Sequence, residues 1–456
     1  MSALAVMMKK RGAIVQGSDV QKNAETEKLL KQNICVFEGH DAKNLKGVFA
    51  VCFSSAIHDD NPEILEAKKQ GLLILKRAEL LACLLREFEN VVAVSGSHGK
   101  TTTTAMIAEM FVRLNLKPTL HIGGIDKLVG SNFLIGENKY AVVEACEYKD
   151  NFLMFYPDIA VILNIDADHL DYFGSIEKVK DSFFRFSKNT NKNGLNIVCF
   201  DDENSKELLK LDNVLSFGFD KRADVCAVNV KKCEFGCFSF DILFFGNLLG
   251  NIKLNIAGKH NILNALASVC VAFACLIDFE DVKFAVENFV GVERRCEKVA
   301  EVNGAMVYHD YAHHPNQIKK MVEVGRLFAK EKGGRVFVVF EPHTYSRTKF
   351  LFEEFVESFV GADVCFFAPA YSARELECEG VEADVLAAKV KEKINQTWFV
   401  ERYEDIVLRI KQMAKCGDVV LVLGAGNVEK LAKMFWWLNG CVLVVVFVFC
   451  GVLWET

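Results

Sequence analysis

The sequence predicts an α/β protein of several domains, and three features support this prediction. Apolar runs rich in Val, Ile and Leu recur along the chain, and a turn and an amphipathic helix follow each run. Such strands are typical of parallel sheets with helices on both faces. A chain of 456 residues is also too long for one hydrophobic core. Between residues 194 and 256 short β-like runs replace this pattern and predict an antiparallel insertion.

Breaks in the alternation of strands and helices predict the domain boundaries. We expect a first domain at 1–88, a central domain at 89–295, a third domain at 296–434 and a hydrophobic tail at 435–456.

Charge and cysteine usage restrict the functional class. The chain has 54 Lys and Arg against 60 Asp and Glu, without a basic block, so nucleic-acid binding is not expected. Its 16 cysteines are scattered, many inside apolar runs, which favours reduced thiols in a cytoplasmic protein.

The tail contains a run, 434–454, with no charged residue and enough length to span a bilayer. A membrane anchor, a packed terminal element and sequence foreign to the fold all remain open. Membrane association is therefore expected only through the tail, and nothing selects between a monomer and a dimer.

The chain begins with a pattern typical of the second half of a nucleotide-binding βαβ unit. A helix is expected over Ser2–Lys10 and a short strand over Ala13–Val15, with Asp19 at the end of that strand.

The strongest chemical signal lies between an apolar strand and a helix, and it reads Gly96, Ser97, His98, Gly99, Lys100, Thr101, Thr102. Glycines let backbone N–H groups turn towards phosphate oxygens, Lys100 would reach the β- and γ-phosphates, and the Thr101 hydroxyl would bind Mg²⁺. The spacing is shorter than that of the usual P-loop, and a simple Gly/Ser turn is the alternative.

Further polar residues follow other predicted strands or open helices. Glu144 and His169 would lie at strand ends, where they could supply metal ligands. Asn261 and Asn264 are one helical turn apart and could bind an adenine edge or cap their helix. Residues 309–315, HDYAHHP, are too polar for an ordinary core, and their spacing is poor for zinc.

With these residues the chain resembles the Mur ligase family. The resemblance covers nearly all of residues 1–433 and rests on strings in the family's order: GSHGKTTTT, EACEYKDNFL, LNIDADHLDYF, GKHNILNA, GVERRCE, HDYAHHP and EPHTYSRTK. It implies a Rossmann-like first domain, a central P-loop ATPase domain and a Rossmann-like third domain. It further implies ATP- and Mg²⁺-dependent ligation of L-alanine to the lactyl carboxylate of UDP-N-acetylmuramate through an acyl phosphate.

By motif match, the resemblance assigns roles to individual residues. Catalysis would use Lys100, Glu144, His169, His313 and Arg347, with His314 and His343 beside them. Of two Mg²⁺ ions, Thr101 and Glu144 would hold one and His169 the other. ATP would contact Gly96, Ser97, His98, Gly99, Lys100, Thr101, Thr102, Asn261, Asn264, Arg295 and Asp310. The UDP-substrate would contact Ser18, Asp19, His40, Ser54, Ser55 and Arg77.

Two other activities remain open: a ligase that attaches an intact tripeptide to UDP-muramate, and a nucleotide-binding remnant with an impaired UDP site. The remnant is considered because the family's first strand and glycine turn would come before Met1.

Overall fold

A computed structural model describes residues 1–54, 57–372 and 380–437. They form two compact units, 1–293 and 294 onwards, and each is described by itself. Ser55 and residues 438–456 of the predicted tail lie outside the described residues.

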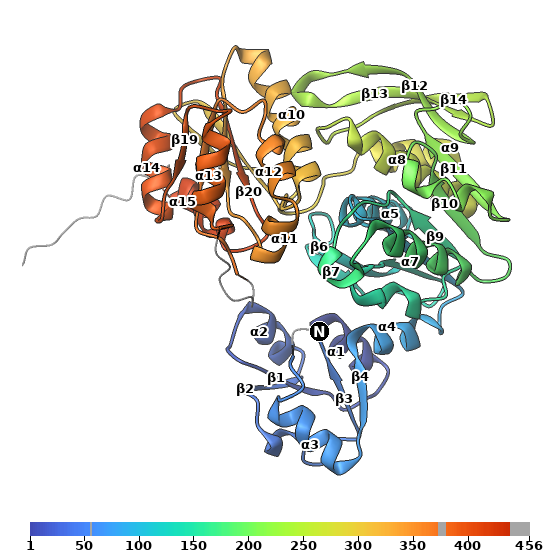
Figure 1. The fold of residues 1–456 in the computed structure, drawn as a ribbon. Coiled ribbons are helices and arrows are strands. Elements are labelled where there is room, and N and C mark those ends of the chain that lie inside the picture. Colours follow the sequence, from blue (N-terminus) through green and yellow to red (C-terminus); the bar gives the residue numbers. More distant parts are fainter. Residues whose placement is uncertain (55–56, 373–379, 438–456) are drawn as a thin grey trace, which may run out of the picture. The chain divides into compact units, whose positions relative to one another are not determined.

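The first domain contains two short parallel sheets, and within the described residues no strand joins them (Figure 1). One pairs β1 with β2, and the other pairs β3 with β4. The elements are α1 (Ser2–Lys10), β1 (Gln16–Asp19), α2 (Ala24–Lys31), β2 (Cys35–Glu38), β3 (Ala50–Phe53), α3 (Pro62–Gln70), β4 (Leu73–Lys76) and α4 (Arg77–Leu85).

The helix expected at residues 2–10 is confirmed as α1, whereas the strand expected at Ala13–Val15 is wrong. Gly12 has a left-handed φ of +88°, and the chain reaches its strand partner only at Gln16, which pairs with Cys35. Ile14 is fully exposed. An apolar run was therefore mistaken for a buried strand.

The central domain is built on one large sheet, which has ten strands within the described residues, in the order β14-β13-β12-β11-β10-β9-β5-β8-β6-β7. β5 runs parallel to its two neighbours, β8 and β9. The strands are β5 (Asn90–Ser95), β6 (Thr119–Asp126), β7 (Ser131–Leu134), β8 (Tyr140–Glu144), β9 (Ile159–Ile162), β10 (Leu195–Cys199), β11 (Val214–Gly218), β12 (Val225–Lys232), β13 (Phe238–Phe244) and β14 (Asn247–Lys253).

The antiparallel segment expected at 194–256 is confirmed for β12, β13 and β14 only. β10 and β11 pair in parallel with each other and with their outer neighbours, β9 and β12. The antiparallel strands therefore extend the parallel sheet instead of forming a separate insertion.

Helices pack on the central sheet because its strands are apolar on both faces. Val91 and Ala93 of β5 belong to a core that also contains Leu4 of α1, Leu81 of α4 and Phe183 of α7. Alternate residues of a strand point to opposite faces, so Val92 and Val94, both fully buried, face the other side. The helices are α5 (Lys100–Arg113), α6 (Leu170–Phe173), α7 (Ile176–Lys188), α8 (His260–Ala274) and α9 (Phe279–Glu287).

A buried pair of carboxyl groups lies between α5 and the end of β6. Glu109 and Asp126 are both 0% exposed, and Arg113 donates to Glu109 at 3.0 Å. Burial, reinforced by the charge of Asp126, raises the pKa of Glu109 to about 7. Burial also raises the pKa of Asp126.

This pair predicts a pH-dependent stability. Folded Glu109 keeps its proton up to about pH 7, whereas the unfolded carboxyl loses it near 4.5, so its stabilisation is complete below pH 4.5 and is lost as the pH rises through 7. The loss is at most about 1.4 kcal/mol per pH unit for one group. In Glu109→Gln the thermal midpoint of the full chain should depend less on pH between 4.5 and 7 than in the unmodified chain.

The matched control is Glu137→Gln, which removes an exposed carboxylate beside Lys117. It should leave the pH dependence of the midpoint unchanged. If Glu109→Gln also left it unchanged, Glu109 would have an ordinary pKa.

The second unit is doubly wound around a sheet in the order β15-β16-β20-β17-β18-β19, in which only the β15–β16 pair is antiparallel within the described residues. Its strands are β15 (Glu297–Val302), β16 (Ala305–Asp310), β17 (Val336–Phe340), β18 (Val364–Phe367), β19 (Thr397–Phe399) and β20 (Val419–Leu423). Its helices are α10 (Pro315–Lys332), α11 (Tyr345–Phe350), α12 (Phe352–Ser358), α13 (Ala383–Lys391), α14 (Tyr403–Met413) and α15 (Val428–Trp437).

Two cores flank this second sheet. Val338 and Phe340 of β17 face one core, and Phe337 and Val339 face the other. Phe435 of α15 is buried in the second core, so the tail boundary predicted at 434/435 falls inside a packed helix. Within the described residues no helix has the length and apolarity needed to cross a membrane.

Candidate nucleotide and metal site

Residues 96–99 connect the end of β5 to the start of α5, as the P-loop prediction requires. Gly99 has φ +85°, and a Cβ there would lie 2.7 Å from the side-chain oxygen of Asn264. The first turn of α5 contains no acidic residue, and no side chain caps it. Its N–H groups and helix dipole therefore favour an anion at this end.

Lys100 is held in a buried ion pair beneath this loop. Its Nζ lies 3.1 and 2.9 Å from the two carboxylate oxygens of Glu147, which is 1% exposed, and it also donates to the backbone carbonyls of Gly96 and Ser97. Burial disfavours the charged lysine, but the neighbouring acidic groups, Glu147 foremost, together outweigh burial, so the pKa of Lys100 is raised. Lys100 is therefore a fixed positive charge at the loop.

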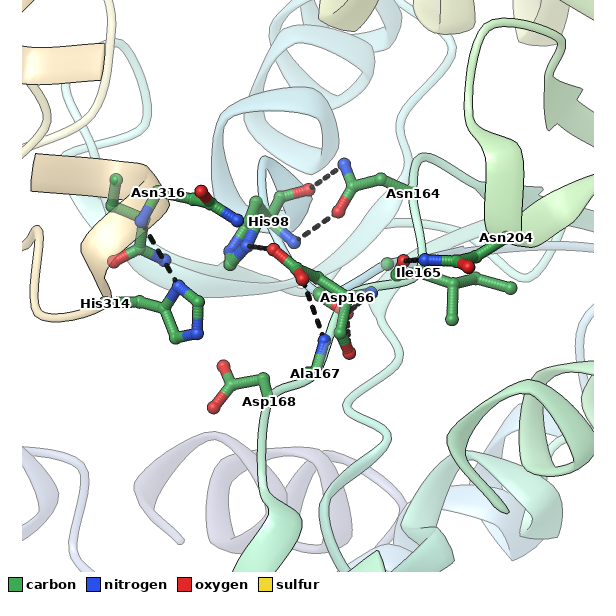
Figure 2. Close-up of polar contacts among 12 residues, drawn as sticks. His98, Asn164, Ile165, Asp166, Ala167, Asp168, Asn204, His314 and Asn316 are labelled. Carbon is green, nitrogen blue, oxygen red and sulfur yellow. Dashed lines mark hydrogen bonds and ion pairs between the residues drawn. The ribbon is translucent and has the colours of Figure 1, made fainter. Parts of the chain in front are cut away.

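The segment after β9 fixes the shape of the loop, as Figure 2 shows. The amide side chain of Asn164 accepts from the N–H of His98 at 2.8 Å and donates to its carbonyl at 3.0 Å. His98 Nε2 lies 2.9 Å from an Asp166 carboxylate oxygen. The sequence analysis assigned no role to Asn164 or Asp166, although both follow an apolar strand as Glu144 does.

The predicted metal ligands lie in two places around the loop. Glu144, at the end of β8, accepts the Gly123 N–H at 2.9 Å, and its negative charge contributes to the raised pKa of Lys100. His169 belongs to a different group, with Glu147 and Asp168, whose ligand atoms all lie within 4.8 Å of one another. Glu144 is not part of that group.

The two glycines after His121 explain why β6 can pass so close to these ligands. A Cβ on Gly123 would come within 2.3 Å of the Glu144 carboxylate, and one on Gly124 within 3.2 Å of the Thr101 methyl carbon. The signal in the sequence was the pair of adjacent glycines inside an apolar run, and neither glycine was among the predicted site residues.

The predicted adenine contacts are buried and already hydrogen-bonded. Asn264 donates to the Asn261 side chain at 2.8 Å, and Asn261 donates to the Ala257 carbonyl at 2.7 Å. These hydrogen bonds fit the alternative in which the asparagines stabilise the start of their own helix. Adenine binding by Asn261 and Asn264 stays a prediction.

In the first domain, two of the predicted UDP contacts come together. Ser18 donates to a Glu63 carboxylate oxygen at 2.6 Å and lies 2.9 Å from His40 Nδ1, so the histidine N–H donates to the serine oxygen. Glu63 was not predicted. Asp19 follows Ser18 at the end of β1, and Ser54 follows β3. Arg77, the first residue of α4, contacts His121 of β6.

In the second unit, Arg295 and Asp310 lie near one end of β16. Asp310 is buried and accepts the N–H groups of Cys296 and Ala312 at 2.7 and 2.8 Å. Burial raises its pKa, and Arg295 opposes that effect. Arg295 also lies over the ring of Tyr311.

The remaining predicted residues of the second unit form a cluster of their own. His313 donates from Nδ1 to the Tyr311 carbonyl at 2.8 Å, and its ring lies 5.8 Å from that of His343. Arg347 lies 3.3 Å from His343 Nδ1. His314 caps α10, where it accepts the Asn316 N–H.

Comparison with known proteins identifies related sequences along the whole chain. Residues 1–89 match the Mur ligase family catalytic domain, residues 94–272 the Mur ligase middle domain, and residues 294–426 the Mur ligase glutamate ligase domain. A UDP-N-acetylmuramate–L-alanine ligase from Caldicellulosiruptor saccharolyticus is 43% identical over 95% of both chains. One from Clostridium tetani is 40% identical over 95% of both chains.

Solved structures agree with the sequence matches. A UDP-N-acetylmuramate-alanine ligase from Thermotoga maritima is 28% identical, covers 96% of both chains and superposes with a TM-score of 0.81. The resemblance drawn from the motifs and the α/β, three-domain fold class are both confirmed. The chain belongs to the Mur ligase family.

Proposed function

We propose that the chain ligates L-alanine to the lactyl carboxylate of UDP-N-acetylmuramate, with hydrolysis of ATP to ADP and phosphate. The observation that carries the proposal is the buried Lys100 at a P-loop whose neighbouring strand ends in Glu144. Phosphoryl transfer requires positioning and charge neutralisation more than covalent chemistry from the protein, and this edge of the sheet offers both. The curated relatives named above carry the same activity in their names.

The residues present fit a triphosphate and a divalent cation. The uncapped start of α5 and the Lys100 ammonium suit phosphate oxygens. Mg²⁺ prefers oxygen ligands, which Thr101, Glu144, Glu147 and Asp168 could supply, and His169 lies beside the last two. When bound, Mg²⁺ would neutralise charge on the phosphates.

In the proposed reaction, Lys100 and the α5 N-terminus hold the γ-phosphate while a lactyl carboxylate oxygen bonds to its phosphorus and ADP leaves. The alanine amine then bonds to the acyl carbon, the bond from that carbon to the phosphate oxygen breaks, phosphate leaves, and the nitrogen loses a proton to solvent. For the second unit we propose that Arg295 and Asp310 contact ATP and that His313 and Arg347 contact the acyl phosphate and alanine.

The experiment that tests the proposal is a steady-state assay of ADP release with single omissions. Release should require UDP-N-acetylmuramate, L-alanine and Mg²⁺ together, and mass spectrometry should find UDP-N-acetylmuramoyl-L-alanine.

Two further outcomes would overturn the proposal. Product formed from the tripeptide L-Ala-γ-D-Glu-diaminopimelate in preference to L-alanine would identify a tripeptide ligase. Binding of ATP with no ADP release under any combination would identify a nucleotide-binding remnant.

A further inference from the structure

We infer that His121 is a positioning residue for the UDP-sugar: it holds the Arg77 guanidinium in place for an oxyanion of that substrate. The inference rests on the proposed function, since Arg77 is only a predicted substrate contact. It adds a residue from β6, in the central domain, to a site expected in the first domain.

The contact between the two side chains is short and its polarity is fixed. An Arg77 guanidinium nitrogen lies 2.8 Å from His121 Nε2. A guanidinium has no hydrogen-bond acceptor, so Nε2 must accept and the ring must be neutral, with its proton on Nδ1. Burial, followed by the charge of Arg77, lowers the pKa of His121 to about 3, which agrees with a neutral ring.

A neutral hydrogen-bond acceptor leaves the positive charge of an arginine in place, whereas a carboxylate neutralises it. Elsewhere in the same unit arginines pair with acids: Arg11 with Glu87 at 2.7 Å, and Arg113 with Glu109 at 3.0 Å. Among the described residues, Arg77 contacts a histidine nitrogen and forms no ion pair with a carboxylate. Its orientation is fixed while its positive charge is not neutralised, which suits an arginine that must bind an anion.

The surroundings of Arg77 also suit an anionic ligand. Burial raises the pKa of the Cys52 thiol, and the charge of Arg77 opposes this rise, so the guanidinium lies near the carboxyl end of β3. In open α/β sheets, ligands bind at the carboxyl ends of strands.

β6 links this position to the nucleotide site. His121 is 8% exposed and pairs with Phe133 of β7 and Val143 of β8, so its backbone is held from both sides. Two residues further on, the Gly123 N–H donates to Glu144. The same stretch of β6 therefore supports both the arginine predicted to hold the UDP-sugar and a predicted metal ligand.

The group that Arg77 would bind is an oxyanion. UDP-N-acetylmuramate carries two kinds of oxyanion, its diphosphate and its lactyl carboxylate. The two sources are separated by titrating UDP-N-acetylglucosamine, which has the diphosphate and lacks the lactyl group. A weaker affinity of the variants for both sugars would assign the diphosphate. A weaker affinity for UDP-N-acetylmuramate alone would assign the carboxylate.

The test compares variants in the full chain by calorimetry and by the ligase assay. His121→Leu should raise the KM for UDP-N-acetylmuramate roughly tenfold and leave kcat and the KM for ATP within about twofold. His121→Gln, which keeps a neutral acceptor, should recover most of the affinity. Arg11→Ala, which removes a carboxylate-paired arginine of the same domain, should change neither KM.

A double-mutant cycle decides whether His121 acts through Arg77. Arg77→Ala should weaken sugar binding at least as much as His121→Leu, and the double variant should bind no worse than Arg77→Ala alone. Additive losses would overturn the inference, and so would an unchanged KM in His121→Leu. If the unmodified chain showed no sugar- and alanine-dependent ADP release but still bound UDP-N-acetylmuramate, the proposed function would fail and calorimetry would still test His121.

Discussion

Replacing Lys100 by methionine is expected to lower ADP release by roughly 100- to 1,000-fold at saturating substrates. The ammonium group that would meet the γ-phosphate is lost, while the residues predicted to bind the UDP-sugar are untouched. The measurement is the steady-state rate together with the dissociation constant for UDP-N-acetylmuramate, which should stay within about twofold.

The structure shows why Lys100→Met should be tested together with a second substitution. Removing Lys100 leaves the Glu147 carboxylate buried without its cation, which itself destabilises the fold. The double variant Lys100→Met/Glu147→Gln removes both charges and should recover the thermal midpoint, not the activity. The control Lys117→Met removes an exposed ammonium and should retain full activity. Substantial turnover in the folded double variant would mean that Lys100 has no part in phosphoryl transfer.

Glu147→Gln alone is expected to lower the free energy of unfolding of the nucleotide-free protein by about 3 kcal/mol. The change leaves a largely buried ammonium whose remaining contacts are the carbonyls of Gly96 and Ser97. ADP phosphates can replace the missing negative charge. The rise in thermal midpoint on adding ADP in EDTA should therefore be larger in Glu147→Gln than in the unmodified chain.

The comparison for this variant is Glu87→Gln, which breaks an exposed ion pair with Arg11 and should cost no more than about 1 kcal/mol. It should leave the effect of ADP unchanged. An equal effect of ADP in Glu147→Gln and the unmodified chain would show that Glu147 does not balance the charge of Lys100.

Motifs and helices formed by consecutive residues could be predicted from the sequence. Contacts that depend on the order of strands in the sheet could not. The P-loop could be predicted because an apolar strand, glycines, Lys-Thr and a helix follow one another directly. Helix α1 could be predicted because its Ala and Met residues lie on one side, its end is basic and Gly12 follows it. The strand predicted at Ala13–Val15 was wrong because a short apolar run does not show whether a neighbouring strand is available to pair with it.

The contacts Lys100–Glu147 and Arg77–His121 join residues far apart in the chain. They exist because β5 lies between β8 and β9, and because β6 lies beyond β8. The spacing of the motifs carries no information about that order. Glu144 and His169 were predicted as ligands of two different metal ions, whereas the grouping of His169 with Glu147 and Asp168 needed the structure.

The position of β5 in the sheet also bears on how the protein is made. β5 is synthesised before both of its neighbours, because β8 begins at Tyr140 and β9 at Ile159. Parallel strands need long crossover connections, and chains emerge from the ribosome at about 5–20 residues per second. For several seconds the apolar segment 91–95 therefore has no partner strand. During that interval its apolar side chains stay unpaired, and the loop after β5 gains its Asn164 contacts only once β9 has paired alongside β5.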